Sequence, residues 1–261
     1  MIYHFFSKTD PGRARDNNED CVAFDESTLT AVLADGMGGY NAGEIASGMA
    51  TAFIKSELSR WLTEAGEGVK AREVRRAMEI CVDNANRSIF NSANSNANYA
   101  GMGTTLVVGV FREDKLVLGH IGDSRCYRLR DGLLDQITRD HSLLQEQMDA
   151  GLITTEQAAT STIKNLVTRA LGVDESVLLE VNEHLVQAGD LYLMCSDGLS
   201  DMIDDIAISK VVSSEIPLDQ KATQLIDLAN ENGGRDNISV LMVEVYEAPE
   251  KRGLIARLLG R

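Results

Sequence analysis

Proline is scarce in this chain: 3 of its 261 residues are prolines, and no Pro-rich linker divides the sequence. This length allows one or two domains, and a single large domain is common at this size. Long hydrophobic runs are also missing, because no stretch approaches ~18 consecutive apolar residues, so no transmembrane helix is expected. The N-terminal residues Met1–Phe6 have neither a basic region nor a long apolar run, which argues against a signal peptide. We therefore expect a cytoplasmic protein.

Paired cysteines are absent as well. The four cysteines are Cys21, Cys81, Cys126 and Cys195, and none forms a C-x-x-C pair. Zinc and redox motifs are therefore not indicated. Each cysteine lies in an apolar context and is expected to be a small core residue.

Positive charge is in short supply. The chain has 25 Lys and Arg against 40 Asp and Glu, a net charge of −15. Binding to a nucleic-acid backbone needs a basic surface, so no nucleic-acid partner is expected. Carboxylates that bind divalent cations would account for part of the acidic excess, and the remainder is solvated surface.

What the sequence does contain is a pattern of strands in hairpin-linked groups and helices in pairs. This pattern predicts an α+β fold with antiparallel sheets rather than alternating βαβ units. Strands are predicted over 2–9, 20–25, 29–35, 104–111, 115–121, 125–130, 177–186, 190–196 and 238–245. Helices are predicted from Ala42, along an apolar face of Ile45, Met49, Phe53, Leu58, Trp61 and Leu62, then along Val74, Met78, Cys81, Ala85 and Ile89, and finally over 205–213 and 219–232. Residues 91–98 are predicted to form a loop, and residues 141–171 are helix-like and polar.

Two Asp-Gly pairs follow nearly continuous apolar strands. Asp35-Gly36 follows Thr30–Ala34, and Asp197-Gly198 follows Leu191–Cys195. Asp-Gly alone is an ordinary turn dipeptide, and Asp131-Gly132 is predicted to be such a turn. A carboxylate at the end of a buried strand, however, must be paired or bound to a cation.

A third aspartate lies in a similar setting, Asp236 in Gly234-Arg235-Asp236-Asn237. Mg²⁺ and Mn²⁺ prefer oxygen ligands from carboxylates, backbone carbonyls and water. We therefore expect the chain to bring Asp35, Asp197 and Asp236 together around metal ions.

Two further polar segments are weak signals in isolation. Arg15 precedes Glu19-Asp20, and arginine suits bidentate recognition of phosphate. Taken alone, this stretch is better explained as a solvated loop with local ion pairs. Asp123 follows the apolar strand 115–121, in Gly122-Asp123-Ser124-Arg125.

The order of these segments along the chain is more specific than any one of them. The ordered segments are Arg-x-x-x-Glu-Asp at 15–20, Asp-Gly-Met-Gly-Gly at 35–39, Gly-Met-Gly-Thr-Thr at 101–105, Gly-Asp-Ser-Arg at 122–125, Ser-Asp-Gly-Leu at 196–199 and Gly-Arg-Asp-Asn at 234–237. Together they resemble the metal-dependent protein phosphatase 2C (PPM) family, in its bacterial Ser/Thr phosphatase branch. Thr138–Ser142 and Thr168–Gly172 also look like that branch, and the resemblance covers about residues 5–246.

The resemblance implies a four-layer α-β-β-α sandwich of two antiparallel sheets flanked by helix pairs. Residues 1–246 would form a single catalytic domain with a flap at 142–166, and residues 247–261 would form a basic amphipathic tail. The implied activity is hydrolysis of phosphoserine and phosphothreonine on proteins by a hydroxide that bridges two Mn²⁺ or Mg²⁺ ions. Implied partners are phosphorylated proteins, with a cognate Ser/Thr kinase and its substrates among them, and a monomer is expected.

The resemblance also assigns roles, residue by residue. Asp35, Asp197 and Asp236 would ligate the two central metals together with the Gly36 carbonyl, and Asp123 would hold a third, weaker ion with Asp197. Glu19 and Asp20 would support metal-bound waters, Asn237 would position Asp236, and Arg15 would bind the substrate phosphate.

One position departs from the family pattern. Eukaryotic members often have His, a proposed general acid, where this chain has Met37. Methionine cannot donate a proton, so the leaving-group proton would come from a metal-bound water or another residue. The four histidines, His4, His120, His141 and His184, do not match that motif, and His120 is expected to pack beside its strand.

Two other functions remain open at this point. The first is a non-catalytic relative that senses phosphate or acts as a scaffold. Loss of a metal aspartate would have been its sign, and none is lost. The second is a different two-metal hydrolase such as a phosphodiesterase, although the lack of basic stripes disfavours nucleic-acid substrates. The basic tail could likewise pack on the domain or dock to a partner or a membrane surface.

Overall fold

The computed structural model describes residues 1–39, 42–154, 157–158 and 166–248. A first antiparallel sheet has five strands in the order β1-β11-β10-β7-β8. Its strands are β1 (Ile2–Asp10), β7 (Arg125–Arg130), β8 (Leu133–Gln136), β10 (Leu191–Cys195) and β11 (Ile238–Tyr246). The first and last strands of the described chain are therefore neighbours.

A second antiparallel sheet has the order β2-β3-β5-β6-β9, with the short β4 paired to the end of β3. Its strands are β2 (Asp20–Asp25), β3 (Thr30–Met37), β4 (Gly103–Thr104), β5 (Leu106–Arg112), β6 (Lys115–Ile121) and β9 (Glu180–Leu185). The central strands β3 and β5 are buried almost throughout, which their continuous apolar sequences predict.

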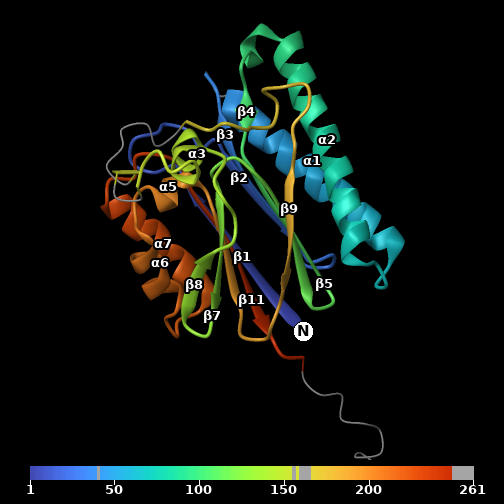
Figure 1. The fold of residues 1–261 in the computed structure, drawn as a ribbon, viewed down its shortest axis with the longest axis vertical. Helices are drawn as coiled ribbons and strands as arrows, with labels where there is room; N and C mark the ends of the chain where they lie inside the picture. Colours follow the sequence, from blue (N-terminus) through green and yellow to red (C-terminus); the bar gives the residue numbers. More distant parts are fainter. Residues whose placement is uncertain (40–41, 155–156, 159–165, 249–261) are drawn as a thin grey trace, which may run out of the picture.

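The sheets face each other across one hydrophobic cluster, which contains Phe111, Tyr192 and Leu241. A second cluster lies between the β2-to-β9 sheet and the long helices α1 (Ala42–Ala65) and α2 (Ala71–Ser95). A third lies between the other sheet and α5 (Asp197–Ser200), α6 (Asp205–Val212) and α7 (Leu218–Glu231). Figure 1 shows the two groups of helices on opposite sides of the sheets. The predicted four-layer α-β-β-α sandwich is therefore confirmed.

The apolar face of α1 differs from the predicted one. Ile45 is exposed, and Met49, Phe53 and Trp61 are only partly buried. The fully buried line consists of Ala42, Ala46, Ala50, Ile54, Leu58 and Leu62. Small alanines let the helix lie close to the sheet, and the larger side chains cover the flanks of the contact.

Three boundary predictions were wrong. Residues 91–98 are not a loop, because α2 continues to Ser95 and a 3-10 turn covers Ala97–Tyr99. The described part of 141–171 is not one long helix. It contains the short helix α3 (Leu143–Asp149) and two helical residues at 157–158, and Val167 forms a β-bridge with Ser142. Strand β8 was missed because its residues are mostly exposed and show no apolar alternation. Asp131-Gly132 is the predicted turn, with both residues at positive φ as a tight hairpin requires.

No helix among the described residues is long and apolar enough to cross a membrane. The predicted flap at 142–166 falls partly on residues 155–156 and 159–165, which lie outside the described residues. The predicted tail at 247–261 lies outside them from residue 249 onward.

Candidate active site

The polar segments singled out in the sequence meet at one cavity of about 450 Å³. Its walls contain four aspartates, Asp35, Asp123, Asp197 and Asp236, together with Arg15, Glu19 and Gly36. These residues come from strand ends and loops of both sheets and from the start of α5, which follows β10. The expectation that Asp35, Asp197 and Asp236 converge is therefore met by the geometry.

Asp35 lies at the end of β3, and its backbone is held on both sides. Its N–H donates to Thr105 Oγ1 at 3.0 Å. Its carbonyl accepts hydrogen bonds from Thr104 Oγ1 at 2.8 Å and from the Thr105 N–H at 2.9 Å. The backbone that carries this carboxylate therefore has little freedom to move.

Asp20 lies beside Asp35, because the two residues are directly paired across β2 and β3. Its side chain is only 8% exposed. Ser196 Oγ donates to Asp20 Oδ2 at 2.8 Å, whereas Asp20 Oδ1 has no hydrogen-bond partner among the described residues. A buried carboxylate oxygen without a donor is costly, and a nearby cation or a water bound to it would remove that cost.

Gly36 occupies a place where no side chain fits. A Cβ atom there would lie 2.1 Å from the Gly43 carbonyl oxygen and 2.6 Å from the Glu19 carbonyl oxygen. The Gly36 N–H donates to that same Glu19 carbonyl at 3.1 Å. The end of β3 is thus packed closely between the Glu19 loop and the start of α1, and Gly36 lines the cavity.

Asn237 joins the segments around Asp236. Its Oδ1 accepts from the Glu19 N–H at 2.8 Å, and its Nδ2 donates to the carbonyls of Pro11 at 3.0 Å and Asn17 at 2.8 Å. Its own N–H donates to Asp236 Oδ1 at 2.9 Å. Asn237 therefore connects the N-terminal loop to the aspartate that precedes it.

The carboxylates of the cavity repel one another. Burial, with the charges of Asp20 and Asp197 next, raises the pKa of Asp35 well above its usual range. Burial and the charge of Asp123 do the same for the pKa of Asp197. Burial also raises the pKa of Asp20 to about 7 and that of Asp123 to about 6. An oxygen-rich cluster of this kind suits hard divalent cations, whose charge offsets the repulsion.

Comparison with known proteins identifies the family of the chain. A family model described as "Protein phosphatase 2C" matches residues 13–240. The chain belongs to the protein phosphatase 2C family. It is therefore an enzyme, a metal-dependent protein serine/threonine phosphatase, as the sequence resemblance predicted.

Its relatives are bacterial protein phosphatases. It is 36% identical over 244 residues to the serine/threonine phosphatase Stp of Listeria monocytogenes, covering 92% of this chain and 95% of that protein. It is 37% identical over 249 residues to the serine/threonine protein phosphatase PstP of Mycobacterium tuberculosis, covering 95% of this chain but 46% of the longer PstP.

Solved structures agree with the fold. The structure of PstP/Ppp from Mycobacterium tuberculosis has a TM-score of 0.86 at 36% identity, covering 95% of this chain and all of that one. The catalytic domain of PstP in complex with 2 manganese ions has a TM-score of 0.82 at 36% identity, covering 94% and 99% of the two chains. The predicted dependence of the family on divalent metals is confirmed by these comparisons.

Two residues of the phosphatase cavity, Thr105 and Val167, were not assigned a role from the sequence. Thr105 lies in the Gly-Met-Gly-Thr-Thr segment, which was recognised only as part of the ordered series. Leu166 and Val167 line the cavity from the segment before Arg169. Leu166 is the last residue of the predicted flap at 142–166, whereas Val167 carries no polar signal, so only the tertiary structure reveals its place in the cavity.

Met37 is also a cavity residue, as its place after Gly36 implies. The histidine expectation is met for His120, which is buried at the end of β6 and is not among the residues that line this cavity.

Proposed function

We propose that the cavity carboxylates of this phosphatase hold two Mn²⁺ or Mg²⁺ ions. Asp35, Asp197 and Asp236 would be the carboxylate ligands, and the Gly36 carbonyl would be a further oxygen ligand. The observation that carries this proposal is the convergence of partly buried, mutually repelling carboxylates in one cavity. When bound, two divalent ions would lower the pKa of a water molecule and offset the negative charge of the phosphate.

Further residues would tune the centre. Asp123, with Asp197, would hold a third and weaker ion, since both line the same cavity. Glu19 and Asp20 would accept hydrogen bonds from ordered water, which suits the unpartnered Asp20 Oδ1. Asn237 would keep Asp236 in place through its hydrogen bonds to the loop at 11–19.

Arg15 would bind the phosphate of the substrate. Its guanidinium lies at the cavity and is about half exposed, so it is accessible from solvent. A planar guanidinium can donate two parallel hydrogen bonds to phosphate oxygens. Met37 supplies no proton, so the leaving-group oxygen would be protonated by water in the cavity or by another residue.

The direct test is hydrolysis of p-nitrophenyl phosphate and of a phosphothreonine peptide with Mn²⁺ and with EDTA. We expect activity only with the metal, and strong loss in Asp197→Ala and Asp236→Ala. Equal activity in EDTA, or full activity in both variants, would contradict the proposed site. Absence of Mn²⁺ binding by calorimetry would favour a non-catalytic relative, and preference for a phosphodiester in a substrate panel would favour another two-metal hydrolase.

The finer biological setting is also proposed. Substrates would be phosphoproteins of a cognate Ser/Thr kinase in the cytoplasm, and the enzyme would act as a monomer. Residues 1–246 would be the catalytic domain, with 142–166 as a substrate-reading flap and 247–261 as a separate tail. The phosphoproteome of a deletion strain, light scattering of the purified protein and a 1–246 truncation would test these points in turn.

A further inference from the structure

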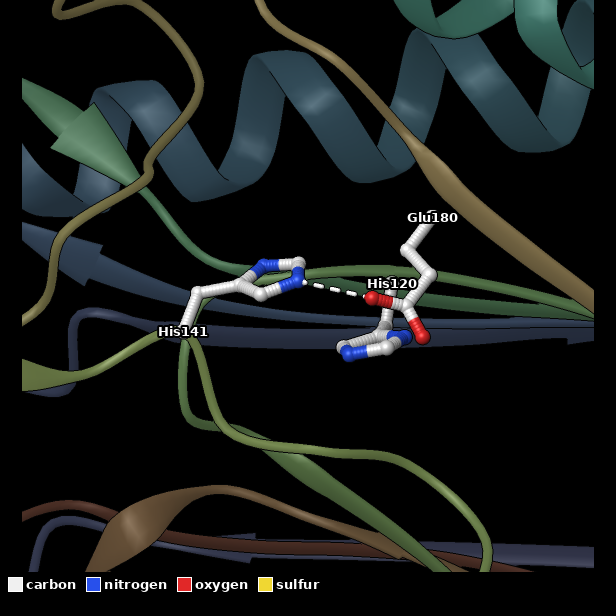
Figure 2. A group of neighbouring side chains, drawn as sticks. All are labelled: His120, His141 and Glu180. Atoms are coloured by element: carbon white, nitrogen blue, oxygen red, sulfur yellow. Dashed lines mark hydrogen bonds and ion pairs between the residues drawn. The ribbon is translucent and has the colours of Figure 1, made fainter. Parts of the chain in front are cut away.

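Beside the cavity lies a second group of polar side chains, His120, His141 and Glu180 (Figure 2). One ligand-type atom from each residue lies within 4.8 Å of the others. The two imidazole rings are stacked, with centroids 4.6 Å apart and an angle of 14° between their planes. His120 Nε2 lies 2.8 Å from the Arg139 carbonyl, to which it donates. The group therefore fixes the chain segment that leads into His141.

His141 holds Gly122 with two hydrogen bonds. Its N–H donates to the Gly122 carbonyl at 2.8 Å, and its Nδ1 accepts from the Gly122 N–H at 3.2 Å. Gly122 immediately precedes Asp123, one of the cavity carboxylates. The next residue, Ser124, shares a hydrogen bond of 2.8 Å with Thr105. Asp123 therefore lies between two anchored neighbours.

His141 also supports a second wall of the cavity. Its carbonyl accepts from the Thr168 N–H at 2.8 Å, and the next residue, Ser142, forms a β-bridge with Val167. Leu166 and Val167 line the cavity. His141 thus connects the turn that carries Asp123 with the part of the cavity wall formed by Leu166 and Val167.

The hydrogen bond from the Gly122 backbone determines which ring nitrogen of His141 carries the proton. A backbone N–H can only donate, so Nδ1 of His141 must be the unprotonated nitrogen. Nε2 then carries the hydrogen and donates to Glu180 Oε2 at 3.2 Å, the contact dashed in Figure 2. Glu180 thereby selects the tautomer that lets Nδ1 accept from Gly122.

The same pattern argues against a metal ion in this group. A metal at Nε2 would displace its proton and would require Nδ1–H, which would then point at the Gly122 N–H. Arg169 Nη1 also lies 3.3 Å from Nε2. In this tautomer both groups are donors, so the contact is not a hydrogen bond, and the guanidinium would repel a cation bound at Nε2.

We propose that His141, oriented by Glu180, is a positioning residue that sets Asp123 and the Leu166–Val167 wall for phosphate-ester hydrolysis. This inference rests on the proposed function, because it assigns a task within the same cavity. If it holds, a His141 variant that loses the acceptor for the Gly122 N–H needs more metal and has a higher KM for a peptide, even when it remains folded.

Two substitutions separate the contacts of His141. In His141→Asn the amide oxygen takes the place of Nδ1 and can accept from Gly122, while the contact with Glu180 is lost. In His141→Gln the amide lies near the Nε2 position, so the Glu180 contact is kept and the Gly122 acceptor is lost. His184→Gln is the matched control, because His184 lies on the same strand as Glu180 and outside the residues that line the cavity.

The measurements are the Mn²⁺ concentration for half-maximal activity, and KM and kcat for a phosphothreonine peptide and for p-nitrophenyl phosphate. Loss of a partner for one buried donor corresponds to about a tenfold change in an equilibrium constant. We expect His141→Gln to need about tenfold more Mn²⁺ and to raise KM for the peptide more than for the aryl phosphate. His141→Asn should stay within about twofold of the wild type for the Mn²⁺ requirement, which amounts to rescue by the retained acceptor.

Several outcomes would overturn the inference. One is a His141→Gln enzyme that is folded by circular dichroism and has an unchanged Mn²⁺ requirement. Another is equal behaviour of the Asn and Gln variants. A third is Co²⁺ absorption with nitrogen ligation that disappears in both His120→Asn and His141→Asn, which would show a metal site. If the wild-type enzyme itself shows no metal-dependent activity, the proposed function fails first, and the two failures are distinguishable.

Discussion

Arg15 Nη2 lies 2.8 Å from Asp236 Oδ2, although the two residues are 221 positions apart in the chain. The hydrogen bond to Asp236, and then its charge, raises the pKa of the Arg15 guanidinium. The group proposed to bind phosphate is therefore already paired with a carboxylate proposed to bind metal. Because a guanidinium has five N–H donors, it can keep this contact and still donate to a phosphate.

Replacing Arg15 tests this dual role. We expect Arg15→Ala to raise KM for a phosphothreonine peptide by about tenfold or more, because a charge-assisted contact to phosphate is lost. The KM of Arg15→Lys should lie between those of Arg15→Ala and the wild type, because lysine keeps the positive charge but lacks the planar guanidinium that can donate two parallel hydrogen bonds. Steady-state kinetics check both, with Arg13→Ala as the control from the same loop. An unchanged KM in Arg15→Ala would remove Arg15 from phosphate binding.

Neutralising one cavity aspartate should stabilise the metal-free protein. Burial and the charge of Asp123 raise the pKa of Asp197, so its carboxylate destabilises the fold at neutral pH. Asp197→Asn should therefore raise the melting temperature in EDTA, by about 2–4 °C for each kcal/mol gained. The same variant should lose at least about a hundredfold in Mn²⁺-dependent activity.

The control for this experiment is Asp131→Asn, at the Asp-Gly pair that forms an ordinary exposed turn. Asparagine tolerates the positive φ of that residue, so little change is expected. If Asp197→Asn melted at a lower temperature than the wild type in EDTA, repulsion between the cavity carboxylates would not be the main effect of Asp197 on stability.

Gly36, near the end of β3, and Gly39, shortly after this strand, allow a matched pair of alanine variants. A Cβ at Gly36 would overlap the Gly43 and Glu19 carbonyls, whereas at Gly39 it would meet no atom of the described residues within 4 Å. We expect Gly36→Ala to lose about 1–3 kcal/mol of stability and most of its activity, because the backbone of a proposed ligand must shift. Gly39→Ala should change neither the stability nor the activity strongly. Urea unfolding and activity with Mn²⁺ measure both, and similar behaviour of the two variants would refute the close-packing argument.

The neutral state of His141 predicts a pH dependence. Burial lowers the pKa of His141, the hydrogen bond to Glu180 opposes this, and the charges of His120 and Arg169 add to the lowering. The unfolded chain titrates near about 6.5, so the contribution of the neutral ring to stability is full above that pH. It is lost as the pH falls from about 6.5 toward the lower folded pKa.

His141→Asn removes this titration. We expect its destabilisation relative to wild type to be smaller at about pH 5.5 than at about pH 7.5, values on either side of the usual histidine pKa. Urea unfolding at both pH values gives the two differences in free energy. The exposed His4, as His4→Asn, serves as the control. A difference that does not change with pH would contradict the assignment of a neutral, buried ring.

Much of the fold was predictable because burial leaves a local signal. The continuous apolar residues of β3 and β10 indicated central strands, and Val74, Met78 and Ile89 marked the buried face of α2. The end of α2 was missed because residues 91–95 are polar except for Ala93, a residue with a weak hydrophobic signal. The face of α1 was misjudged because alanine carries a weak hydrophobic signal, although Ala46 and Ala50 are fully buried.

By itself, the sequence determined which chemical groups stand at the strand ends, and in which order, and this order was enough to indicate the family. Only the tertiary structure decided which groups touch. The pairing of Asp20 with Asp35 follows from strand register, and the contact of Arg15 with Asp236 follows from the adjacency of β1 and β11. The hydrogen bonds between His141 and Gly122 likewise join segments that no local sequence pattern connects. Such contacts depend on how the sheets and the loops at their ends pack, and short-range sequence patterns carry no information about that packing.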